Sequence, residues 1–493
     1  FCPMFAAGAQ VCDVLTRDRV VNTLVLILGA AASELFPEEQ ALRLTARSGH
    51  PDGCVAFQAG PSCSRQQSCR RLTERVKELI EYSASVSLLE LPRAKAAEVL
   101  HRCRQEQGSA LCLSLQSEMV PLHRIQAGGV DFYAPAVSEV VPPQLLATCA
   151  WDLRYAEDCL YLVGPTNDSC FVHATFEPPL HEPSAAQISV ADLNLQKDDH
   201  TDLLFLSETV HDASLAALAE RVVSSRATVV VVAGPSSSGK TTFTHRLRMH
   251  LRARGKVAQL IECDDYYRAR TDPLHPRDEN GELNFEDADA LQLERLAQDV
   301  TAVLQGETVN LPHFNFKDGT SCAASGRLAS LPSDGVLMLE GIFGLHPKFL
   351  RQVDAVFFRV LIGPWSGVRI GDLFVMPESM LRLLRRIGRD TAHRGVTATQ
   401  VVHKFRSVSN GERINIFEHA GKAHAVFDSA LFYELSALKP HIKAGLDSAG
   451  GTAEEQAIVA QLQSIVAWIE GWSSVQVPRT SILMEFVGKS IFG

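Results

Sequence analysis

The fold of this 493-residue chain is decided by the segment Thr228-Val-Val-Val-Val-Ala233-Gly234-Pro-Ser-Ser-Ser-Gly239-Lys240-Thr241. Its first half is a β-branched run typical of a buried strand, and its second half matches the pattern GxxxxGK[ST]. A helical, basic stretch follows. A glycine-rich surface turn with a solvated lysine is the alternative, but the strand–loop–helix order is the setting in which this motif binds nucleotide phosphates.

The residue types of the loop fit phosphate chemistry. Gly234 and Gly239 allow backbone N–H groups to approach phosphate oxygens closely. Lys240 is predicted to reach the β- and γ-phosphates, and the Thr241 hydroxyl is predicted to hold Mg²⁺. The predicted ATP contacts are Gly234, Ser236, Ser237, Ser238, Gly239, Lys240, Thr241 and Thr242, to which Arg394 is added below.

Helical and strand patterns alternate after residue 200. Apolar strands are predicted over 228–233, 257–263, 336–340 and 355–362, and helices over 213–223, from 241, and over 288–304. Such alternation is typical of a parallel sheet that is covered on both faces. We therefore expect an α/β fold with the doubly wound parallel sheet of the P-loop NTPases.

Three carboxylates follow strands of this pattern. Asp264 and Asp265 end the strand after the loop helix; one is predicted to take the proton of an acceptor hydroxyl, and the other to hold the loop. Glu340 closes the strand 336–340 and is predicted to ligate the metal ion. Ordinary strand-ending acids are the alternative. The chain has no NKxD tetrapeptide and no LSGGQ-like signature, which argues against a GTPase or a transporter ATPase.

An arginine-rich stretch lies between residues 381 and 394, where cations at three- and four-residue spacing alternate with leucines and an isoleucine. The pattern predicts a helix that buries one face and directs guanidinium groups at phosphates, as a lid does. A solvated charged face is the alternative. The arginines are Arg382, Arg385, Arg386, Arg389 and Arg394.

Composition narrows the classes of function. A formal net charge of −10 argues against a protein that coats nucleic acid or an anionic membrane. The 12 cysteines include no CxxC pair, so a reducing, cytoplasmic setting is expected. The apolar stretch 20–35 is interrupted by polar residues and is predicted to be a buried helix, not a membrane span. The chain starts at Phe1, which leaves any targeting segment open.

Four regions are expected along the chain. Residues 1–180 mix helical stretches with short β-like runs, such as 110–115 and 159–163, and are predicted to form an α+β domain. Residues 181–222 are expected to be a linker and a lead-in helix. The P-loop kinase domain is placed at 223–445, and a helical C-terminal extension at 446–493.

A series of motifs resembles the uridine kinase/phosphoribulokinase family. In order they are Gly234–Thr241, Asp264-Asp-Tyr-Tyr267, Asn284-Phe-Glu-Asp-Ala-Asp-Ala290, Leu311-Pro-His-Phe-Asn-Phe316, Leu339-Glu-Gly-Ile342 and Arg382–Asp390. The branch that is most similar carries a threonyl-tRNA synthetase-like N-terminal domain, and the stretches 427–435 and 481–486 resemble that branch as well.

The resemblance implies a role for each matching residue. Asp264 is the implied base for a ribose 5'-hydroxyl, with Lys240, Arg386 and Arg389 as its catalytic partners. Thr241 and Glu340 are the implied Mg²⁺ ligands, and Arg394 completes the lid contacts. The implied acceptor-binding residues are Asp264, Tyr267, Glu286, Phe314 and Arg386.

Two departures from the family pattern concern the acceptor. Uridine kinases carry a tyrosine and a downstream histidine that recognise the pyrimidine, where this chain has Phe314 and Gly319. Loss of polar recognition groups lowers discrimination between similar ligands, so a purine nucleoside, a broad nucleoside range or another polyol stays open.

The N-terminal region resembles the editing-type synthetase domain around 24–36 and 129–143. The metal-binding histidines of that domain have no counterpart in 22–28, and the spacings His50/Cys54 and Cys170/His173 provide too few ligands. We therefore expect a binding, regulatory or structural domain without editing activity.

The resulting hypothesis is Mg-ATP-dependent phosphorylation of the 5'-hydroxyl of a nucleoside by a cytoplasmic kinase. Its expected partners are ATP and a small-molecule acceptor, without membrane or nucleic acid, and its oligomeric state is open. The alternatives are a nucleotide-binding regulatory protein with a degenerate site and a kinase of a non-nucleoside alcohol.

Overall fold

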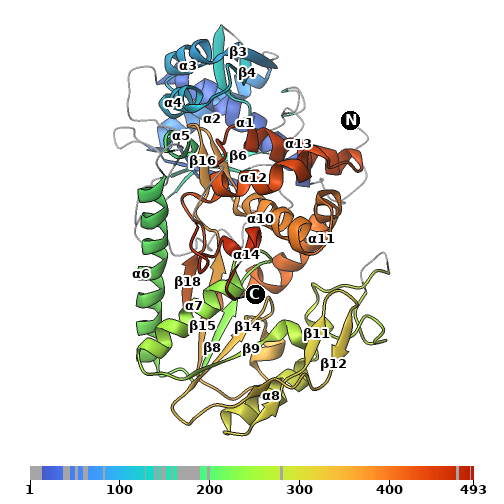
Figure 1. Ribbon diagram of the computed structural model, residues 1–493. Coiled ribbons are helices and arrows are strands. Elements are labelled where there is room, and N and C mark those ends of the chain that lie inside the picture. The colour runs from blue at the N-terminus through green and yellow to red at the C-terminus, as the bar shows by residue number, and fades with distance from the viewer. Residues whose placement is uncertain are drawn as a thin grey trace.

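Two connected parts make up the chain in the computed structural model (Figure 1): an N-terminal part with antiparallel sheets and a larger part around a parallel sheet. The structure describes residues 14–36, 45–49, 54–58, 65–81, 84–127, 129–137, 140, 143, 146, 151–156, 159–163, 189–196, 200–277, 281–472, 477–488 and 490–492.

The larger part is organised by one sheet with the strand order β18-β15-β8-β14-β9, in which every pairing is parallel. Because the strands are parallel, their carboxyl ends meet at one edge, where α/β sheets bind ligands. The strands are β8 (Val229–Ala233), β9 (Ala258–Glu262), β14 (Val336–Glu340), β15 (Phe357–Gly363) and β18 (Ala425–Asp428).

Helices cover both faces of this sheet. In β8, Val230 and Val232 enter one hydrophobic core, which they share with α6, α7, α10, α12 and α13. Val229 and Val231 enter the other core, which they share with α8 and α9. The α/β prediction of a doubly wound sheet is therefore confirmed. The helices are α6 (Thr201–Ser225), α7 (Lys240–Ala253), α8 (Leu293–Leu304), α9 (Pro347–Leu350), α10 (Glu378–His393), α11 (Ala398–Asn415), α12 (Glu434–Asp447), α13 (Ala453–Ala467) and α14 (Met484–Val487).

Short strands between α8 and β14 form a smaller lobe, here called the hairpin lobe (residues 309–329), which projects from the sheet at the lower right of Figure 1. β10 pairs with β13, and β11 pairs with β12, both antiparallel. The strands are β10 (Val309–Asn310), β11 (His313–Asn315), β12 (Thr320–Cys322) and β13 (Leu328–Ala329), and the 3₁₀ turns that lead toward the lobe are η3 (Cys263–Tyr266) and η4 (Ala288–Ala290).

The N-terminal part combines helices with two antiparallel sheets, β1-β2-β7-β6 and β3-β4-β5, which confirms the α+β prediction. The strands are β1 (Thr45–Gly49), β2 (Cys54–Gln58), β3 (Ser85–Pro92), β4 (Met119–Ala127), β5 (Val130–Pro135), β6 (Asp152–Ala156) and β7 (Cys159–Val163). The helices are α1 (Val14–Leu35), α2 (Arg65–Glu81), α3 (Arg93–Arg102), α4 (Glu106–Ser114) and α5 (Val190–Leu195).

One strand prediction in this part is wrong. Residues 110–115 lie mostly in helix α4, whereas the predicted strand at 159–163 is β7. Leu111 and Cys112 are both fully buried while Leu113 is 60% exposed, so the apolar run follows helical rather than alternating spacing. The buried helix predicted for 20–35 is α1, and none of the described helices is long and apolar enough to cross a membrane.

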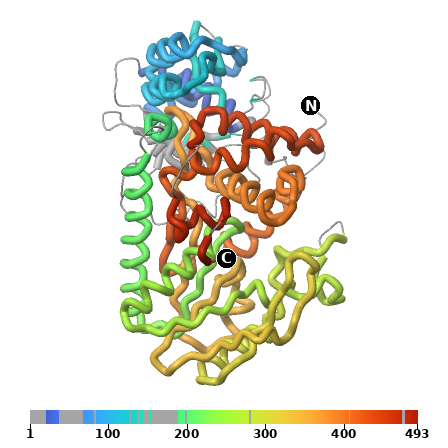
Figure 2. The backbone as a smooth tube through the Cα atoms, in the orientation of Figure 1, coloured from blue at the N-terminus to red at the C-terminus, as the bar shows by residue number. Residues whose placement is uncertain are grey.

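A hairpin of the larger part, β16 (Val368–Ile370) with β17 (Phe374–Met376), packs into the N-terminal part. Leu373 and Val375 belong to the same hydrophobic core as α1, and Gly108 N donates to Asp372 Oδ2 over 2.9 Å. Figure 2 shows the C-terminal helices, in red, between the N-terminal part and the parallel sheet. The hairpin that contacts the N-terminal part therefore directly precedes α10, the helix that carries most of the predicted lid arginines.

Candidate active site

The loop between β8 and α7 has the backbone shape of a phosphate cradle. A Cβ atom at Gly234 would overlap the backbone oxygen of Ile362, so this position requires glycine. Ser237 and Gly239 have positive φ angles of 59° and 88°, and Gly239 directly precedes the first helical residue, Lys240. The loop therefore turns sharply and directs the amides of the α7 N-terminus toward its interior.

Polar groups line the interior of this loop. The hydroxyl oxygens of Ser237 and Ser238 are buried, and within the described residues they have no hydrogen-bond partner. Lys240 is 8% exposed, and its Nζ donates to Gly234 O and Pro235 O, each over 3.1 Å. Buried hydroxyls and a buried ammonium in one loop suit a phosphate group, which accepts hydrogen bonds from both.

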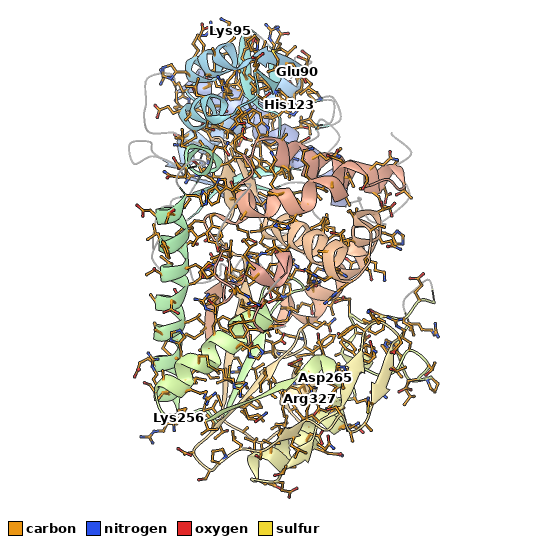
Figure 3. All side chains as sticks on the ribbon, viewed as in Figure 1. Glu90, Lys95, His123, Lys256, Asp265 and Arg327 are labelled. Carbon is orange, nitrogen blue, oxygen red and sulfur yellow. The ribbon has the colours of Figure 1, made fainter. Side chains whose placement is uncertain are left out.

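The two aspartates after β9 have different surroundings. Asp265 is buried and accepts hydrogen bonds from His313 Nδ1 over 2.8 Å and from an Arg327 guanidinium nitrogen. Figure 3 shows Asp265 next to Arg327, which is a residue of the hairpin lobe. Phe314 N lies 3.4 Å from the same carboxylate. Asp265 thus fixes β11 to the end of β9.

Asp264 is half-buried, and no described residue donates a hydrogen bond to its carboxylate. Burial raises the pKa of Asp264, while Lys240, Arg394 and Arg389 act in the opposite direction. Asp264 therefore lies within electrostatic reach of these three cations.

Glu340 ends β14 beside the loop and is 6% exposed. Burial raises its pKa to about 8; Lys240 opposes the rise, and Asp264, Glu262 and Glu485 add to it. A bound cation would relieve this crowding of carboxylates. A carboxylate and the Thr241 hydroxyl are the hard oxygen donors that suit Mg²⁺, which usually keeps waters and substrate phosphates as its other ligands. The described residues contain no cluster of three or more side chains that would form an all-protein metal cage.

The α10 arginines separate into two groups, of which the first surrounds Asp390. Arg389 Nε donates to Asp390 over 2.8 Å, Arg386 Nε lies 3.4 Å from the same carboxylate, and an Arg394 nitrogen lies 3.5 Å away. Burial acts to raise the pKa of Asp390, but the three cations outweigh it and lower the pKa. Three guanidinium groups share one carboxylate, so the cluster keeps positive charge for a phosphate group.

The second group holds the phosphate loop itself. Arg382 donates to Ser236 O over 3.2 Å, and Arg385 donates to Ser237 O over 3.3 Å. Both guanidinium groups are buried, and each is paired with a carboxylate: Arg382 with Glu412 over 2.7 Å, and Arg385 with Glu434. Sequence reasoning predicted a single lid face and identified neither carboxylate, although Glu434 lies within a stretch noted for its resemblance.

An aromatic cluster lies beside Asp264, toward the hairpin lobe. Tyr267 packs against Phe285, Phe314 and Phe316 with ring centroids 5.5, 5.6 and 6.0 Å away, and Tyr267 Oη donates to Phe285 O over 3.1 Å. Phe314 is 2% exposed. Tyr267 and Phe314 belong to the buried core that includes α8, and of the four rings Phe316 is the most exposed, at 49%.

Two further groups border this cluster. Burial raises the pKa of Glu286 to about 7; Glu412 and Asp264 add to the rise, whereas Arg386 and Lys240 oppose it. Gly319 has a φ of 72°, and a Cβ there would overlap the side chain of Arg270. Arg270 therefore fills the space next to Gly319, and its guanidinium donates to Phe316 O over 2.8 Å.

The C-terminal segment, residues 477–488, contacts the nucleotide end of α7, which sequence reasoning did not foresee. Glu485 Oε2 accepts a hydrogen bond from Thr242 N over 3.2 Å. A Cβ at Gly239 would overlap the Ile482 side chain, and the Phe486 ring lies 4.9 Å below the Arg385 guanidinium. This segment therefore supplies one wall of the loop.

The residues predicted for the site come together at the carboxyl edge of the sheet. The phosphate loop, Asp264, Glu340 and the arginines around Asp390 surround one region, and Tyr267, Glu286 and Phe314 border it toward the hairpin lobe. His50, Cys170 and His173 of the N-terminal region lie outside the described residues, as does the side chain of Cys54.

Comparison with known proteins finds relatives of the larger part of this chain. A family model described as phosphoribulokinase/uridine kinase matches residues 229–430. Uridine kinases from two Staphylococcus aureus strains, JH9 and Newman, are each 30% identical over 182 residues, which cover 37% of this chain and 77% of the relative. The solved structure of D-glycerate 3-kinase from Cryptococcus neoformans var. grubii is 16% identical, covers 41% of this chain and 88% of that chain, and has a TM-score of 0.28.

The matched segment contains the phosphate loop, the two aspartates, Glu340 and the arginines of α10. Phosphate-binding loop, acid at the strand end and cationic helix are the parts of an ATP-dependent small-molecule kinase. This chain belongs to the phosphoribulokinase/uridine kinase family.

Proposed function

We propose that this protein transfers the γ-phosphoryl group of Mg-ATP to the 5'-hydroxyl of a nucleoside. The observation that carries the proposal is that the two aspartates after β9 have different partners. Asp265 is fixed to His313 and Arg327, whereas Asp264 is left facing Lys240, Arg389 and Arg394. A carboxylate placed between a phosphate loop and an acceptor pocket is suited to accept a hydroxyl proton.

On the donor side, ATP phosphates lie in the loop formed by Gly234, Ser236, Ser237, Ser238, Gly239, Lys240, Thr241 and Thr242. Thr241 and Glu340 hold Mg²⁺, which neutralises charge on the phosphate oxygens when it is bound. The raised pKa of Glu340, about 8, makes its ionised form depend on that cation. Metal binding and carboxylate ionisation therefore support each other.

In the chemical step, the acceptor hydroxyl oxygen bonds to the γ-phosphorus as the bond to the bridging oxygen of ADP breaks. Asp264 takes the hydroxyl proton, and burial favours this by raising its pKa. Lys240 and the guanidinium groups of Arg386, Arg389 and Arg394 stabilise charge on the transferred group. ADP is the leaving group.

On the acceptor side, Glu286 accepts hydrogen bonds from ribose hydroxyls in this proposal, and its neighbour Phe285 belongs to the aromatic cluster of Tyr267 and Phe314. Arg386 acts electrostatically on Glu286 and lies 3.4 Å from Asp390, which supports a role for it in contacting both acceptor and phosphates. Family resemblance supports the nucleoside assignment, and the reaction class does not depend on it.

A direct test is ATP consumption with Mg²⁺ against a panel of purine and pyrimidine nucleosides, with mass spectrometry of the product. A nucleoside 5'-monophosphate formed at a rate that requires Asp264 supports the proposal. Tight ATP binding without phosphorylation of any nucleoside would exclude it.

A non-nucleoside alcohol is the second candidate acceptor, because Arg270 fills the space beside Gly319 at the border of the pocket. A guanidinium there suits an acceptor that carries an anionic group. Sugar phosphates and pantothenate in the same panel separate the two candidates, since only one class can give the fast product.

For the N-terminal part we propose a threonyl-tRNA synthetase-like module that binds or supports structure without editing. Its support is the α+β architecture and the core it shares with the β16–β17 hairpin. We place the whole protein in the cytoplasm. An assay for hydrolysis of threonine-specific tRNA charged with a wrong amino acid, with the purified protein, tests the absence of editing.

A further inference from the structure

Glu412 of α11 lies between the phosphate loop and the acceptor side of the site. It is 2% exposed, and its Oε1 accepts hydrogen bonds from Ser236 N over 2.8 Å and from an Arg382 nitrogen over 2.7 Å. The same Arg382 nitrogen donates to Ser236 O over 3.2 Å. Glu412 and Arg382 thus bind the backbone N–H and the backbone C=O of Ser236, respectively.

Arg382 is itself fixed by a second carboxylate, because its Nε donates to Glu378 over 2.6 Å. Burial raises the pKa of Glu412, and the ion pair with Arg382 opposes that rise. A buried pair that loses one partner leaves an uncompensated charge, so Glu412 and Arg382 have to move together with Ser236.

The neighbours of Glu412 on α11 contact the acceptor side. A Cβ at Gly411 would overlap the Cβ of Glu286, and Asn415 Nδ2 donates to Glu286 O over 2.6 Å. Glu412 is also the charged group that does most to raise the pKa of Glu286. The other charged groups that act on Glu286 are Arg386 of α10, Asp264 of η3 and Lys240 of α7.

We propose that Glu412 is a positioning residue that couples the phosphate loop to Glu286, so that nucleotide binding and the state of the acceptor-side carboxylate depend on each other. The coupling rests on the proposed function in one respect, the assignment of Glu286 to the acceptor. A displacement of Ser236 moves Glu412 through the hydrogen bond between them. The movement of Glu412 then affects Glu286 through the backbone of α11, which contacts Glu286 at Gly411, and through the negative charge of Glu412.

The first measurement is the affinity for an ATP analogue that is not hydrolysed, with Mg²⁺, by calorimetric titration. Glu412→Gln keeps the shape and an acceptor for Ser236 N but removes the charge that Arg382 faces. We expect the Kd to rise roughly tenfold or more, the effect of one charge-assisted hydrogen bond. Glu434→Gln makes the same chemical change in the parallel pair with Arg385, which also holds the loop, so it should weaken nucleotide binding as well. It is the matched control for the titration of Glu286, on which Glu434 does not act.

The second measurement follows the titration of Glu286 without any acceptor. The folded-state pKa of Glu286 is raised to about 7, so its contribution to stability is present below the unfolded pKa and is lost as pH rises through about 7. Tm is measured against pH for the wild type and for the Glu286→Gln variant, and the difference between the two curves reports the titration of Glu286. In a Glu412→Gln background this difference should shift to lower pH, whereas a Glu434→Gln background should leave it unchanged.

Both effects together support the coupling, and Glu412→Asp, which restores the charge, should return the titration toward that of the wild type. The proposal is overturned if nucleotide affinity is unchanged, or if Glu286 titrates alike in the Glu412→Gln and wild-type backgrounds. If Glu412→Gln does not fold, the Gly411→Ala variant tests the coupling instead. Its methyl group displaces Glu286, and an unaltered nucleotide Kd then overturns the coupling. Failure of every nucleoside as acceptor would reject the proposed function without affecting these measurements.

Discussion

Replacement of Asp264 by asparagine tests the central assignment of this site. The change keeps the size of the side chain but removes both its charge and its ability to take a proton. A general base contributes about 10² to 10⁴ in rate, so kcat should fall by that factor. Lys240, Arg389 and Arg394 face this carboxylate, so its loss leaves the phosphate region more positive, and ATP affinity should be unchanged or slightly higher.

The assay is steady-state turnover with saturating Mg-ATP and the acceptor found by the panel, together with calorimetric ATP binding. Wild-type kcat should fall as pH decreases through the raised pKa of Asp264, and the asparagine variant should lose this dependence. The pH profile separates a lost base from a general disturbance of the site.

Asp265→Asn is the matched control, since the two aspartates are adjacent and the change is the same. It weakens the contacts with His313 and Arg327, so we expect a lower Tm and a higher acceptor KM with a smaller loss in kcat. Near-normal turnover in Asp264→Asn, combined with loss of turnover in Asp265→Asn, would refute the assignment and give the base role to Asp265.

Three further changes test other parts of the site. Lys240→Ala should weaken ATP binding and lower kcat by about 10² to 10³, measured by calorimetry and turnover, because it removes the buried cation of the loop; unchanged ATP affinity would contradict this. Glu485→Gln should tighten ATP binding by a few-fold to about tenfold, because it keeps an acceptor for Thr242 N but removes a negative charge from the place where a phosphate group would bind; weaker binding would instead mean that Glu485 supports the loop. Acceptor KM should fall as pH rises from about 6 to about 8, since Glu286 with a pKa of about 7 accepts hydrogen bonds from hydroxyls best when ionised, and Glu286→Gln should show a flat profile.

The parts of the fold that could be predicted are those set by local sequence. The β-branched run 228–233 and the glycines at 234 and 239 determine strand, loop and helix within a few residues, and the structure has all three. The run 110–115 failed because a short apolar stretch fits a buried strand and one face of a helix equally well. Leu111 and Cys112 are both buried in α4, so the burial pattern distinguishes the two only after folding.

The sequence predicted those site residues that lie at strand ends or within recognisable motifs. Which aspartate holds the loop depends on His313 and Arg327, which are 48 and 62 residues away from Asp265. Glu412 is 176 residues from Ser236, and Glu485 is 243 residues from Thr242. Such pairings cannot be predicted from the spacing of neighbouring residues, because they form when α11 and the C-terminal segment pack against the loop.

The arrangement of α10 has a consequence for how the site closes. Arg382 and Arg385 are buried and bonded to the phosphate loop, while Arg386 and Arg389 on the neighbouring face stay partly exposed around Asp390. If α10 swung away as a lid, it would break two buried ion pairs, and losing one partner of such a pair typically costs about 3 to 5 kcal/mol. Arg386 and Arg389, which lie on the same helix, are therefore held in a fixed position relative to the loop.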